Sequence, residues 1–177
     1  MGIGSSTSAH EQTTKNFPTY KIIIVGGGLA GTKIAEYISQ HDHQIGEANI
    51  KITLIEPKNC LLYKIGGAKA CLDESHAVSC VSSLSPLTNT KKVKHIQSKV
   101  KFVDVNNKFV LLENDDKCFF SILIITTGAN YSPWVQPRGS NKNQILQHWR
   151  KCGEVLQSPC CKRILVLGGG ATGIEVA

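Results

Sequence analysis

The sequence has no apolar run of about 18 to 20 residues, the length that a membrane-spanning helix requires. We therefore expect no segment of it to cross a bilayer. It also has no C-x-x-C pair and no secretory signal ahead of its seven cysteines, which stand at positions 60, 71, 80, 118, 152, 160 and 161. An odd number of cysteines without such a signal is most simply explained by reduced thiols in a cytosolic protein.

Extremes of composition are absent as well. The 41% apolar and 19% charged residues are ordinary for a soluble globular domain, which argues against disorder over most of the chain. At 177 residues the chain can form one well-buried domain and begin a second, but it is too short for two complete α/β domains. The fold must therefore be inferred from the pattern of residues.

The charge is unbalanced, because 20 Lys and Arg against 13 Asp and Glu give a formal net charge of +7. A dinucleotide, a membrane surface and nucleic acid are the anionic partners that this charge allows. Part of the excess lies between Lys91 and Lys101, where a solvated strand face is the simplest interpretation. Nucleic acid is disfavoured because no aromatic residues alternate with these charges. We expect no metal site, because His41 and His43 offer two ligands where a structural zinc needs four.

Two strands with a helix between them follow a polar start. Residues 1–19 are rich in Ser, Thr and Gly without apolar periodicity, which predicts a flexible arm. Ile22–Val25 is a continuous β-branched run, typical of a strand buried on both faces. Apolar residues recur at helical spacing from Leu29 until the pattern ends at His41. Ile50–Ile55 predicts a second strand, which completes a βαβ unit.

The rest of the chain is less regular. Residues 59–86 give no clear pattern beyond a short helix over residues 68–72. Short alternating runs separated by Asn- and Asp-rich turns then predict an antiparallel β-meander. The runs of the meander cover residues 100–105, 108–112 and 117–120, and they are followed by a buried strand over 122–125, a helix over 144–156 and a strand over 164–167.

The strongest organisational signal is an internal repeat. Lys21–Gly31 and Arg163–Gly173 are both a short apolar strand that enters G-G-G-x-x-G and then a helix. In the first copy Gly26 permits the tight turn, Gly28 lets a pyrophosphate approach the backbone, and Gly31 lets helix and strand pack closely. The helix then presents unpaired N–H groups and the positive end of its dipole to the anion. The repeat therefore predicts dinucleotide binding.

Glu56 stands at the end of the second predicted strand, where a carboxylate can accept hydrogen bonds from ribose hydroxyls. Thr126, Thr127 and Gly128 end the strand that follows the meander. Their small size lets backbone N–H groups reach a bound phosphate or flavin edge, although an ordinary strand-to-loop turn explains them as well. No Ser/His/Asp arrangement is supported by a nucleophile turn, so the sequence predicts no catalytic side chain.

These features resemble, in order, the landmarks of the FAD-dependent pyridine nucleotide-disulfide oxidoreductase superfamily: GGGLAG at 26–31 with Glu56, the meander, ITTGA at 125–129 and GGGATGIEVA at 168–177. Because no two cysteines have the spacing of a redox dithiol, the sequence is most similar to the branch that contains the apoptosis-inducing-factor-like ferroptosis suppressors and the type II NADH dehydrogenases. The Met1-Gly2 start and the segment Gly128–Trp134 resemble the suppressor-like members. The resemblance covers about residues 20–177 and is weakest between 60 and 95.

The resemblance implies an α/β fold in which a Rossmann-like parallel sheet carries an inserted antiparallel meander and is followed by the start of a second Rossmann unit. It also implies electron transfer from NADH or NADPH through FAD to a quinone or similar small-molecule acceptor, with the cofactor performing the electron chemistry. The implied FAD site comprises Gly26, Gly28, Leu29, Ala30 and Gly31 at the pyrophosphate, Glu56 at the adenosine ribose, Val100 at the adenine through its backbone, Thr127 and Gly128 over the cofactor, and Lys69, in place of an Arg, near the flavin. The implied NAD(P)H site begins with Gly168, Gly170, Gly173 and Glu175.

The expected organisation is a flexible arm over residues 1–19, an incomplete FAD-binding domain over 20–140, a connecting helix and loop over 141–161, and the start of an NAD(P)H-binding domain over 162–177. The sequence ends inside the last predicted helix, so we expect residues 1–177 alone to be inactive. A fragment and a genuine short product both remain open. A non-catalytic nucleotide-binding or interaction fragment without a usable NAD(P)H site is the alternative function.

The first six residues fit the pattern M-G-x-x-x-[ST], in which Gly2 accepts a myristoyl group after loss of Met1. Short Gly- and Ser-rich starts also match this pattern by chance, so an acylated and an unmodified start remain equally open. Acylation would place an otherwise cytoplasmic protein in peripheral contact with membranes.

Overall fold

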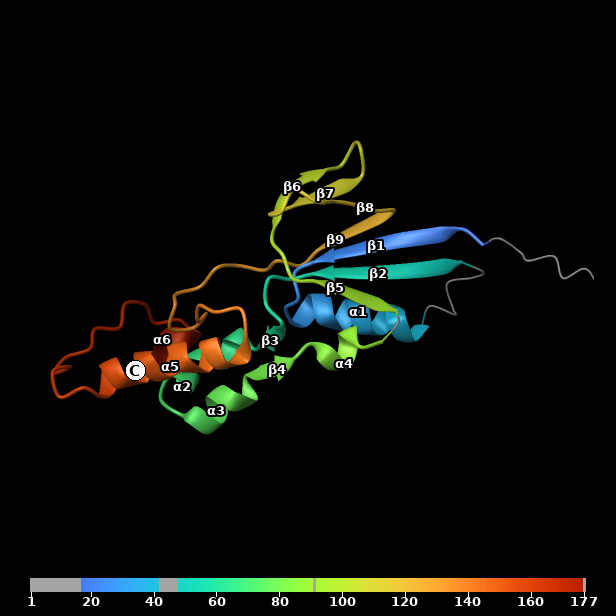
Figure 1. The fold of residues 1–177 in the computed structure, drawn as a ribbon. Helices are drawn as coiled ribbons and strands as arrows, with labels where there is room; N and C mark the ends of the chain where they lie inside the picture. Colours follow the sequence, from blue (N-terminus) through green and yellow to red (C-terminus); the bar gives the residue numbers. More distant parts are fainter. Residues whose placement is uncertain (1–16, 42–47, 91, 177) are drawn as a thin grey trace, which may run out of the picture.

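The structure, a computed structural model, describes residues 17–41, 48–90 and 92–176. Residues 175 and 176 are described as backbone only. Its centre is a parallel four-stranded sheet in the order β5-β2-β1-β9 (Figure 1). The first two strands and α1 (Leu29–His41) confirm the predicted βαβ unit. The strands are β1 (Thr19–Val25), β2 (Asn49–Ile55), β5 (Val93–Ile96) and β9 (Ile122–Ile125).

Both faces of β1 are covered, which explains its continuous β-branched run. On one face Ile22 and Ile24 pack in a cluster with Ala35 of α1. On the other face Ile23 packs with Val110, which comes from the meander. Because successive side chains of a strand point to opposite faces, the run Ile22–Val25 supplies two separate apolar cores.

The strand β9 is less buried than the sequence predicts. Ile122 is 46% exposed and Ile125 is 62% exposed. The prediction of a buried strand is wrong here because β9 lies at an edge of the sheet, where β1 is its one neighbour among the described strands. A β-branched run favours an extended conformation, but it does not determine how many neighbours cover it.

The predicted meander is confirmed as a separate antiparallel sheet that stands beyond one face of the parallel sheet (Figure 1). Lys108 and Asp115, with φ of 53° and 67°, occupy the left-handed region in the turns that connect its strands. Val103, Val110 and Cys118 pack inward against the parallel sheet. The strands are β6 (Val100–Asp104), β7 (Phe109–Leu112) and β8 (Lys117–Phe119).

Residues 60–88 contain structure that the sequence did not predict. A two-stranded antiparallel sheet, β3 with β4, frames several short helices. The short helix expected over residues 68–72 exists but covers Gly67–Ala70. The elements of this region are β3 (Cys60–Leu62), the 3-10 helix η2 (Lys64–Gly66), α2 (Gly67–Ala70), α3 (Glu74–Ser79), β4 (Val81–Ser83) and α4 (Ser85–Thr88).

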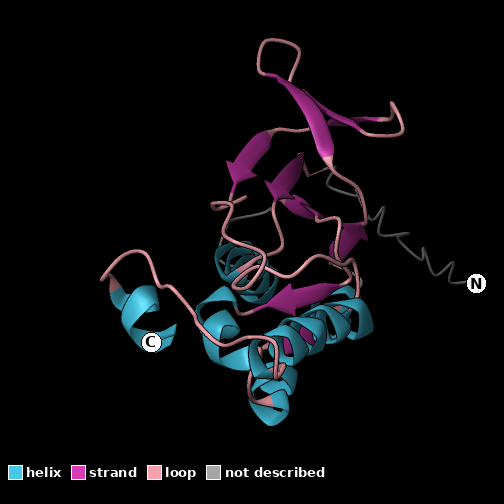
Figure 2. Ribbon diagram, turned by 90° about the vertical axis from the view of Figure 1, so that its left-hand side faces the viewer, coloured by secondary structure: helices cyan, strands magenta, loops and turns pink. Residues whose placement is uncertain are grey.

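The predicted helix over 144–156 is confirmed as α5 (Lys142–Gln157). It begins at Asn141, whose Oδ1 accepts a hydrogen bond of 3.0 Å from the N–H of Gln144. Ile145 and Trp149, both 0% exposed, bury the helix against a cluster that also contains Cys60. Figure 2 shows the helices gathered on one side of the molecule and the meander on the opposite side. No helix in the described ranges is long and apolar enough to cross a membrane.

The prediction of a strand over residues 164–167 is wrong, because residues 161–169 belong to no strand in this structure. Leu165 is 81% exposed and Leu167 is 86% exposed. A strand requires a neighbour that completes its backbone hydrogen bonds, and no described segment pairs with this one. The helix expected after it is present as α6 (Ala171–Val176).

Candidate functional site

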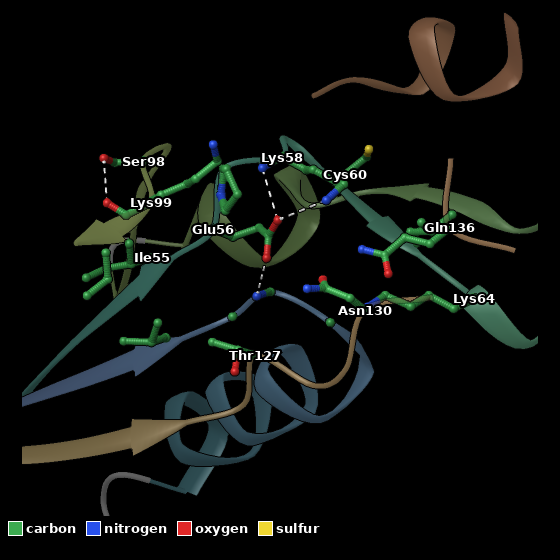
Figure 3. Close-up of a pocket in the computed structure, with 17 residues that line it drawn as sticks. Ile55, Glu56, Lys58, Cys60, Lys64, Ser98, Lys99, Thr127, Asn130 and Gln136 are labelled. Carbon is green, nitrogen blue, oxygen red and sulfur yellow. Dashed lines mark hydrogen bonds and ion pairs between the residues drawn. The ribbon is translucent and has the colours of Figure 1, made fainter. Parts of the chain in front are cut away.

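A cavity of about 330 Å³ lies at the carboxyl ends of β1 and β2 (Figure 3). This is the edge of a parallel sheet at which ligands of doubly wound folds bind. It is lined by the turn Gly26–Gly28, the segment from the end of β2 through β3 to Lys64, the connection from β5 to β6, and the loop after β9. The site therefore combines segments that are up to about a hundred residues apart in the sequence.

The turn after β1 is held by the end of β2 and by the residue that follows β9. Gly26 has a φ of 105°, and its N–H donates to the carbonyl of Ile55 at 2.9 Å. The Thr126 hydroxyl donates to the carbonyl of Gly26 at 2.9 Å. A Cβ at Gly31 would lie 1.9 Å from the same carbonyl, so α1 crosses the turn at a distance that only glycine allows. The predicted roles of Gly26 and Gly31 in this turn agree with the geometry.

Gly28 differs from its neighbours in the turn. A Cβ at Gly28 would meet no atom within 4 Å, so this position faces open space beside the cavity. Leu29 and Ala30 follow at the start of α1, with exposed side chains. Since the first N–H groups of a helix have no intrahelical partner, this end of α1 is suited to an anion.

Glu56 follows the last residue of β2 and reaches back to the glycine turn. Its Oε2 accepts from the N–H of Gly27 at 2.7 Å, and its Oε1 accepts from the N–H of Lys58 at 3.1 Å. The side chain is 13% exposed, and the Lys58 ammonium lies 3.9 Å from Oε1. An ionised carboxylate has about four acceptor sites, so acceptor capacity remains toward the cavity.

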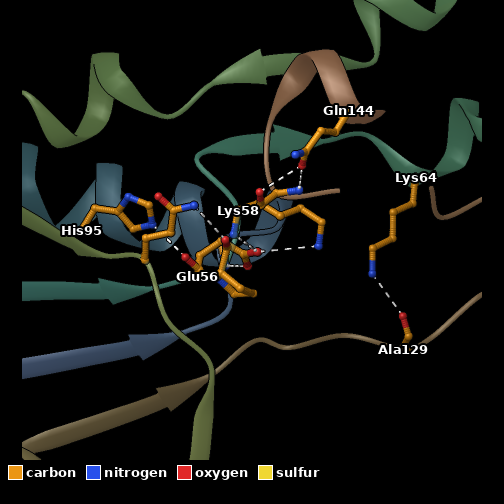
Figure 4. A network of polar contacts seen from close by, with 10 residues as sticks. Glu56, Lys58, Lys64, His95, Ala129 and Gln144 are labelled. Carbon is orange, nitrogen blue, oxygen red and sulfur yellow. Dashed lines mark hydrogen bonds and ion pairs between the residues drawn. The ribbon is translucent and has the colours of Figure 1, made fainter. Parts of the chain in front are cut away.

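Two residues of the β5 strand and its following loop fix the backbone around Glu56 (Figure 4). A ring nitrogen of His95, Nε2, lies 2.9 Å from the carbonyl of Glu56. The side-chain amide of Gln97 donates to the carbonyl of Pro57 at 3.2 Å. Neither residue could be recognised from the sequence, because nothing in the short run of β5 indicates that it pairs with β2.

Val100, predicted to contact the adenine, lines the cavity together with Ser98 and Lys99. Ser98 and Lys99, in the connection from β5 to β6, lie beside Ile55, on one side of Glu56 (Figure 3). Thr127 also lines the cavity. Gly128 has a φ of 69° and no atom within 4 Å of a Cβ built on it, which leaves its backbone accessible.

Lys64 lines the cavity but carried no signal in the sequence. Its ammonium donates to the carbonyl of Ala129 at 3.1 Å and lies 5.6 Å from the ring centroid of Tyr131 (Figure 4). Burial, and then the nearby charge of Lys58, lowers the pKa of Lys64 below its ordinary value. The carbonyl and the ring that contact this ammonium carry no full negative charge, which is compatible with an anionic ligand at this end of the cavity.

Lys69 is not among the residues that line the cavity. Its ammonium lies 3.6 Å from Asp73 and its side chain is 66% exposed. The place near a flavin that the resemblance implies for Lys69 stays a prediction.

Cys60 lines the cavity, yet its side chain packs in the core cluster with Trp149. Burial raises the pKa of the Cys60 thiol, which therefore stays protonated near neutral pH. No group of three or more His, Cys, Asp or Glu side chains able to hold a metal ion occurs among the residues that the structure describes. His43, of the pair considered as zinc ligands, lies outside those residues.

The second glycine turn is separate from this cavity. Gly168 has a φ of 111°, and a Cβ at Gly173 would lie 1.9 Å from its carbonyl, as in the first turn. A Cβ added at Gly168 or Gly170 would meet no atom of the described residues within 4 Å, so these two positions face open space. Glu175 is described as backbone only, and Gly2 lies outside the described residues.

Comparisons with known proteins agree with this geometry. The family model described as pyridine nucleotide-disulphide oxidoreductase matches residues 20–177. Ferroptosis suppressor protein 1 of Xenopus laevis is 28% identical over 177 residues, which cover 99% of this chain and 42% of that protein. The chain thus spans less than half the length of the curated relatives that it matches.

Solved structures show the same fold. NDH2 of Plasmodium falciparum, in complex with NADH, has a TM-score of 0.61 and 23% identity, covering 89% of this chain and 36% of that one. Sulfide:quinone oxidoreductase of Aquifex aeolicus has a TM-score of 0.56 and 17% identity, covering 79% of this chain and 33% of that one. With the family model matching most of its length, the chain belongs to the pyridine nucleotide-disulphide oxidoreductase family.

Proposed function

We propose that this chain binds FAD in the cavity beside Gly28 and is the FAD-binding part of an oxidoreductase. This enzyme passes electrons from NADH or NADPH through FAD to a quinone or similar acceptor. The observation that carries the proposal is the pairing of an open glycine turn with Glu56 at the end of β2. A pyrophosphate fits where Gly28 leaves room, and the remaining acceptor sites of Glu56 fit ribose hydroxyls.

The residues around the cavity fit the two ends of a dinucleotide. Glu56 and Val100 are on the side where an adenosine belongs in this fold. Lys64 and Asn130 are on the other side, where the second half of the cofactor would extend (Figure 3). FAD, when bound, supplies the electron chemistry, while the chain binds and orients it. Lys69 and Gly128 are proposed to border the flavin, and the turn Gly168–Gly173 to begin the NAD(P)H site, with Glu175.

The acceptor and donor are suggested by relatives and neighbours. One structural neighbour is named as a quinone oxidoreductase, and another was solved with NADH. No two cysteines have the sequence spacing of a flavin-linked redox pair, which also favours direct transfer to a diffusible acceptor over a cysteine relay.

Purification and titration test the cofactor assignment. The protein should be yellow with a flavin spectrum, or should take up added FAD. Oxidation of NADH and NADPH with a short-chain quinone should then be assayed for the 177-residue chain and for any longer product of its gene. A colourless protein that takes up no FAD would refute the proposal, and FAD uptake without oxidation by any product would favour the non-catalytic alternative.

We also propose that the protein is cytoplasmic and reaches membranes peripherally through a myristoylated Gly2. One myristoyl chain gives marginal binding, with a constant of about 10⁴ M⁻¹, so only part of the protein should sediment with membranes. Gly2→Ala should leave the protein wholly in the soluble fraction. Failure of the unsubstituted protein to incorporate labelled myristate would refute this proposal.

A further inference from the structure

The loop over residues 129–136 forms one side of the cavity, and its polar side chains are not explained by the glycine turn or by Glu56. Asn130 and Gln136 line the cavity from this loop. Figure 3 shows both amides close to Lys64, on the side of Glu56 away from Ser98 and Lys99. The loop therefore borders the half of the cavity that the adenosine does not occupy in the proposed binding mode.

The hydrogen bonds inside the loop fix the orientation of the Gln136 amide. The N–H groups of Val135 and Gln136 donate to the carbonyl of Ser132 at 3.0 and 2.8 Å. The Oε1 of Gln136 accepts from the N–H of Tyr131 at 3.0 Å. Because a backbone N–H is a donor only, the oxygen must face Tyr131 and the NH₂ group must face away from it.

The Nε2 of Gln136 donates to no group that the structure describes. Its free N–H groups can therefore bind an acceptor atom in the cavity, such as a hydroxyl oxygen, a carbonyl oxygen or a ring nitrogen. In the proposed binding mode the phosphates lie elsewhere, at the turn where a Cβ on Gly28 would meet no atom within 4 Å.

The loop is anchored from behind by α5 and α2. The carbonyl of Trp134 accepts from the indole Nε1 of Trp149 at 3.0 Å and from the thiol of Cys71 at 3.5 Å. Trp149 is 0% exposed, so its indole N–H depends on this carbonyl for a partner. A Cβ at Gly67 would lie 2.3 Å from the carbonyl of Val135, so the loop lies directly on α2. The position of Gln136 thus depends on a residue remote from the cavity.

We propose that Gln136 donates from Nε2 to an acceptor on the flavin half of FAD, and that Trp149 is a positioning residue that holds the loop for this contact. The inference rests on the proposed function and adds a residue that distinguishes FAD from its ADP half. ADP, which lacks the flavin half, does not need the loop.

The test compares the binding of FAD and of ADP to the same protein by titration calorimetry. Gln136→Glu keeps an acceptor for Tyr131 but removes the donor toward the cavity. It should weaken FAD binding about three- to tenfold, the effect of one net hydrogen bond, and leave ADP binding unchanged. Gln147→Glu, which makes the same change on the exposed face of α5, is the matched control and should change neither.

Trp149→Phe keeps an aromatic ring in the core but removes the indole N–H. It should weaken FAD more than ADP, and it should increase amide exchange at Val135 and Gln136 while the β1 amides stay protected. Equal effects on FAD and ADP, or none on FAD, for Gln136→Glu would overturn the inference while leaving FAD binding by the wild type intact. A wild-type protein that binds neither ligand would overturn the proposed function and this inference together.

Discussion

Gly28→Val tests whether the open position in the glycine turn is reserved for a ligand. No atom lies within 4 Å of a Cβ built at Gly28, and its φ is outside the left-handed region in which glycine is favoured. A side chain therefore costs the protein little steric or conformational energy. It would project where a pyrophosphate must approach the backbone.

The size of the effect follows from the contacts that would be lost. A hydrogen bond to a charged group contributes about 1.5–3 kcal/mol, so each backbone N–H kept from the phosphate should weaken binding roughly 10- to 150-fold. Loss of two such bonds would remove FAD binding at micromolar concentrations. The unfolding temperature of the FAD-free protein should stay the same.

Gly31→Ala is the matched control, because it lies in the same motif but faces protein. Its Cβ would lie 1.9 Å from the carbonyl oxygen of Gly26 and 2.6 Å from the Thr126 hydroxyl. Overpacking of this kind costs about 1–3 kcal/mol, which corresponds to a fall of roughly 2–12 °C in Tm for a chain of this size.

The assay is a thermal melt by circular dichroism and a flavin titration for each variant. Gly28→Val should not bind FAD but should have the Tm of the wild type, whereas Gly31→Ala should have a lower Tm in the FAD-free state. If Gly28→Val bound FAD like the wild type, or lowered Tm as much as Gly31→Ala, Gly28 would not be reserved for a ligand.

Three other residues give separate predictions. Burial lowers the pKa of Lys64 from 10.5, so the native state releases this proton at a lower pH than the unfolded state does, and the free energy of unfolding should rise as the pH approaches 10.5. Lys64→Met should reduce that rise, measured by urea unfolding at several pH values. The same pH dependence in the variant and the wild type would contradict this prediction. Burial raises the pKa of Cys71 to about 12, so this thiol should resist iodoacetamide at pH 8 while exposed Cys160 reacts. Equal labelling of the two cysteines, measured by mass spectrometry, would contradict the raised pKa of Cys71. Stability from the buried Cys71 thiol should be present below pH 9.0 and be lost as the pH rises toward 12. Asn141→Ala should lower the free energy of unfolding by about 1 kcal/mol, because it removes the helix cap. Asn141→Asp keeps a capping oxygen and should be tolerated. An equal loss of stability in both variants would contradict the role of the cap.

The parts of the fold that the sequence predicted well are those with local causes. The run Ile22–Val25 and the helical spacing from Leu29 predict their elements without reference to the rest of the chain. Glu56 could be placed at the glycine turn because parallel strands joined by a βαβ unit end at the same edge of the sheet. Its bond to the N–H of Gly27, at 2.7 Å, agrees with that placement.

The parts that were missed depend on contacts between distant segments. β5 is four residues long and includes Lys94 and His95, so its pattern alone did not distinguish it from the meander. Its pairing with β2 brings His95 to the backbone of Glu56. Gln136 could not be recognised either, because its orientation depends on a loop that Trp149 holds from another helix.

A comparison of the two glycine turns shows which features come from the local sequence and which require neighbouring segments of the fold. Gly26 and Gly168 have φ of 105° and 111°, and in both turns a Cβ added at the third glycine would lie 1.9 Å from the first glycine's carbonyl oxygen. At the first turn the residue after β9 packs so closely that a Cβ on Gly26 would lie 2.6 Å from the carbonyl oxygen of Thr126, whereas a Cβ on Gly168 would meet no described atom within 4 Å. The sequence G-G-G-x-x-G therefore builds the turn by itself, but a cavity forms only where adjacent strands bring a carboxylate and further loops to it. We therefore expect nucleotide binding at the second turn to require a strand that pairs with residues 164–167.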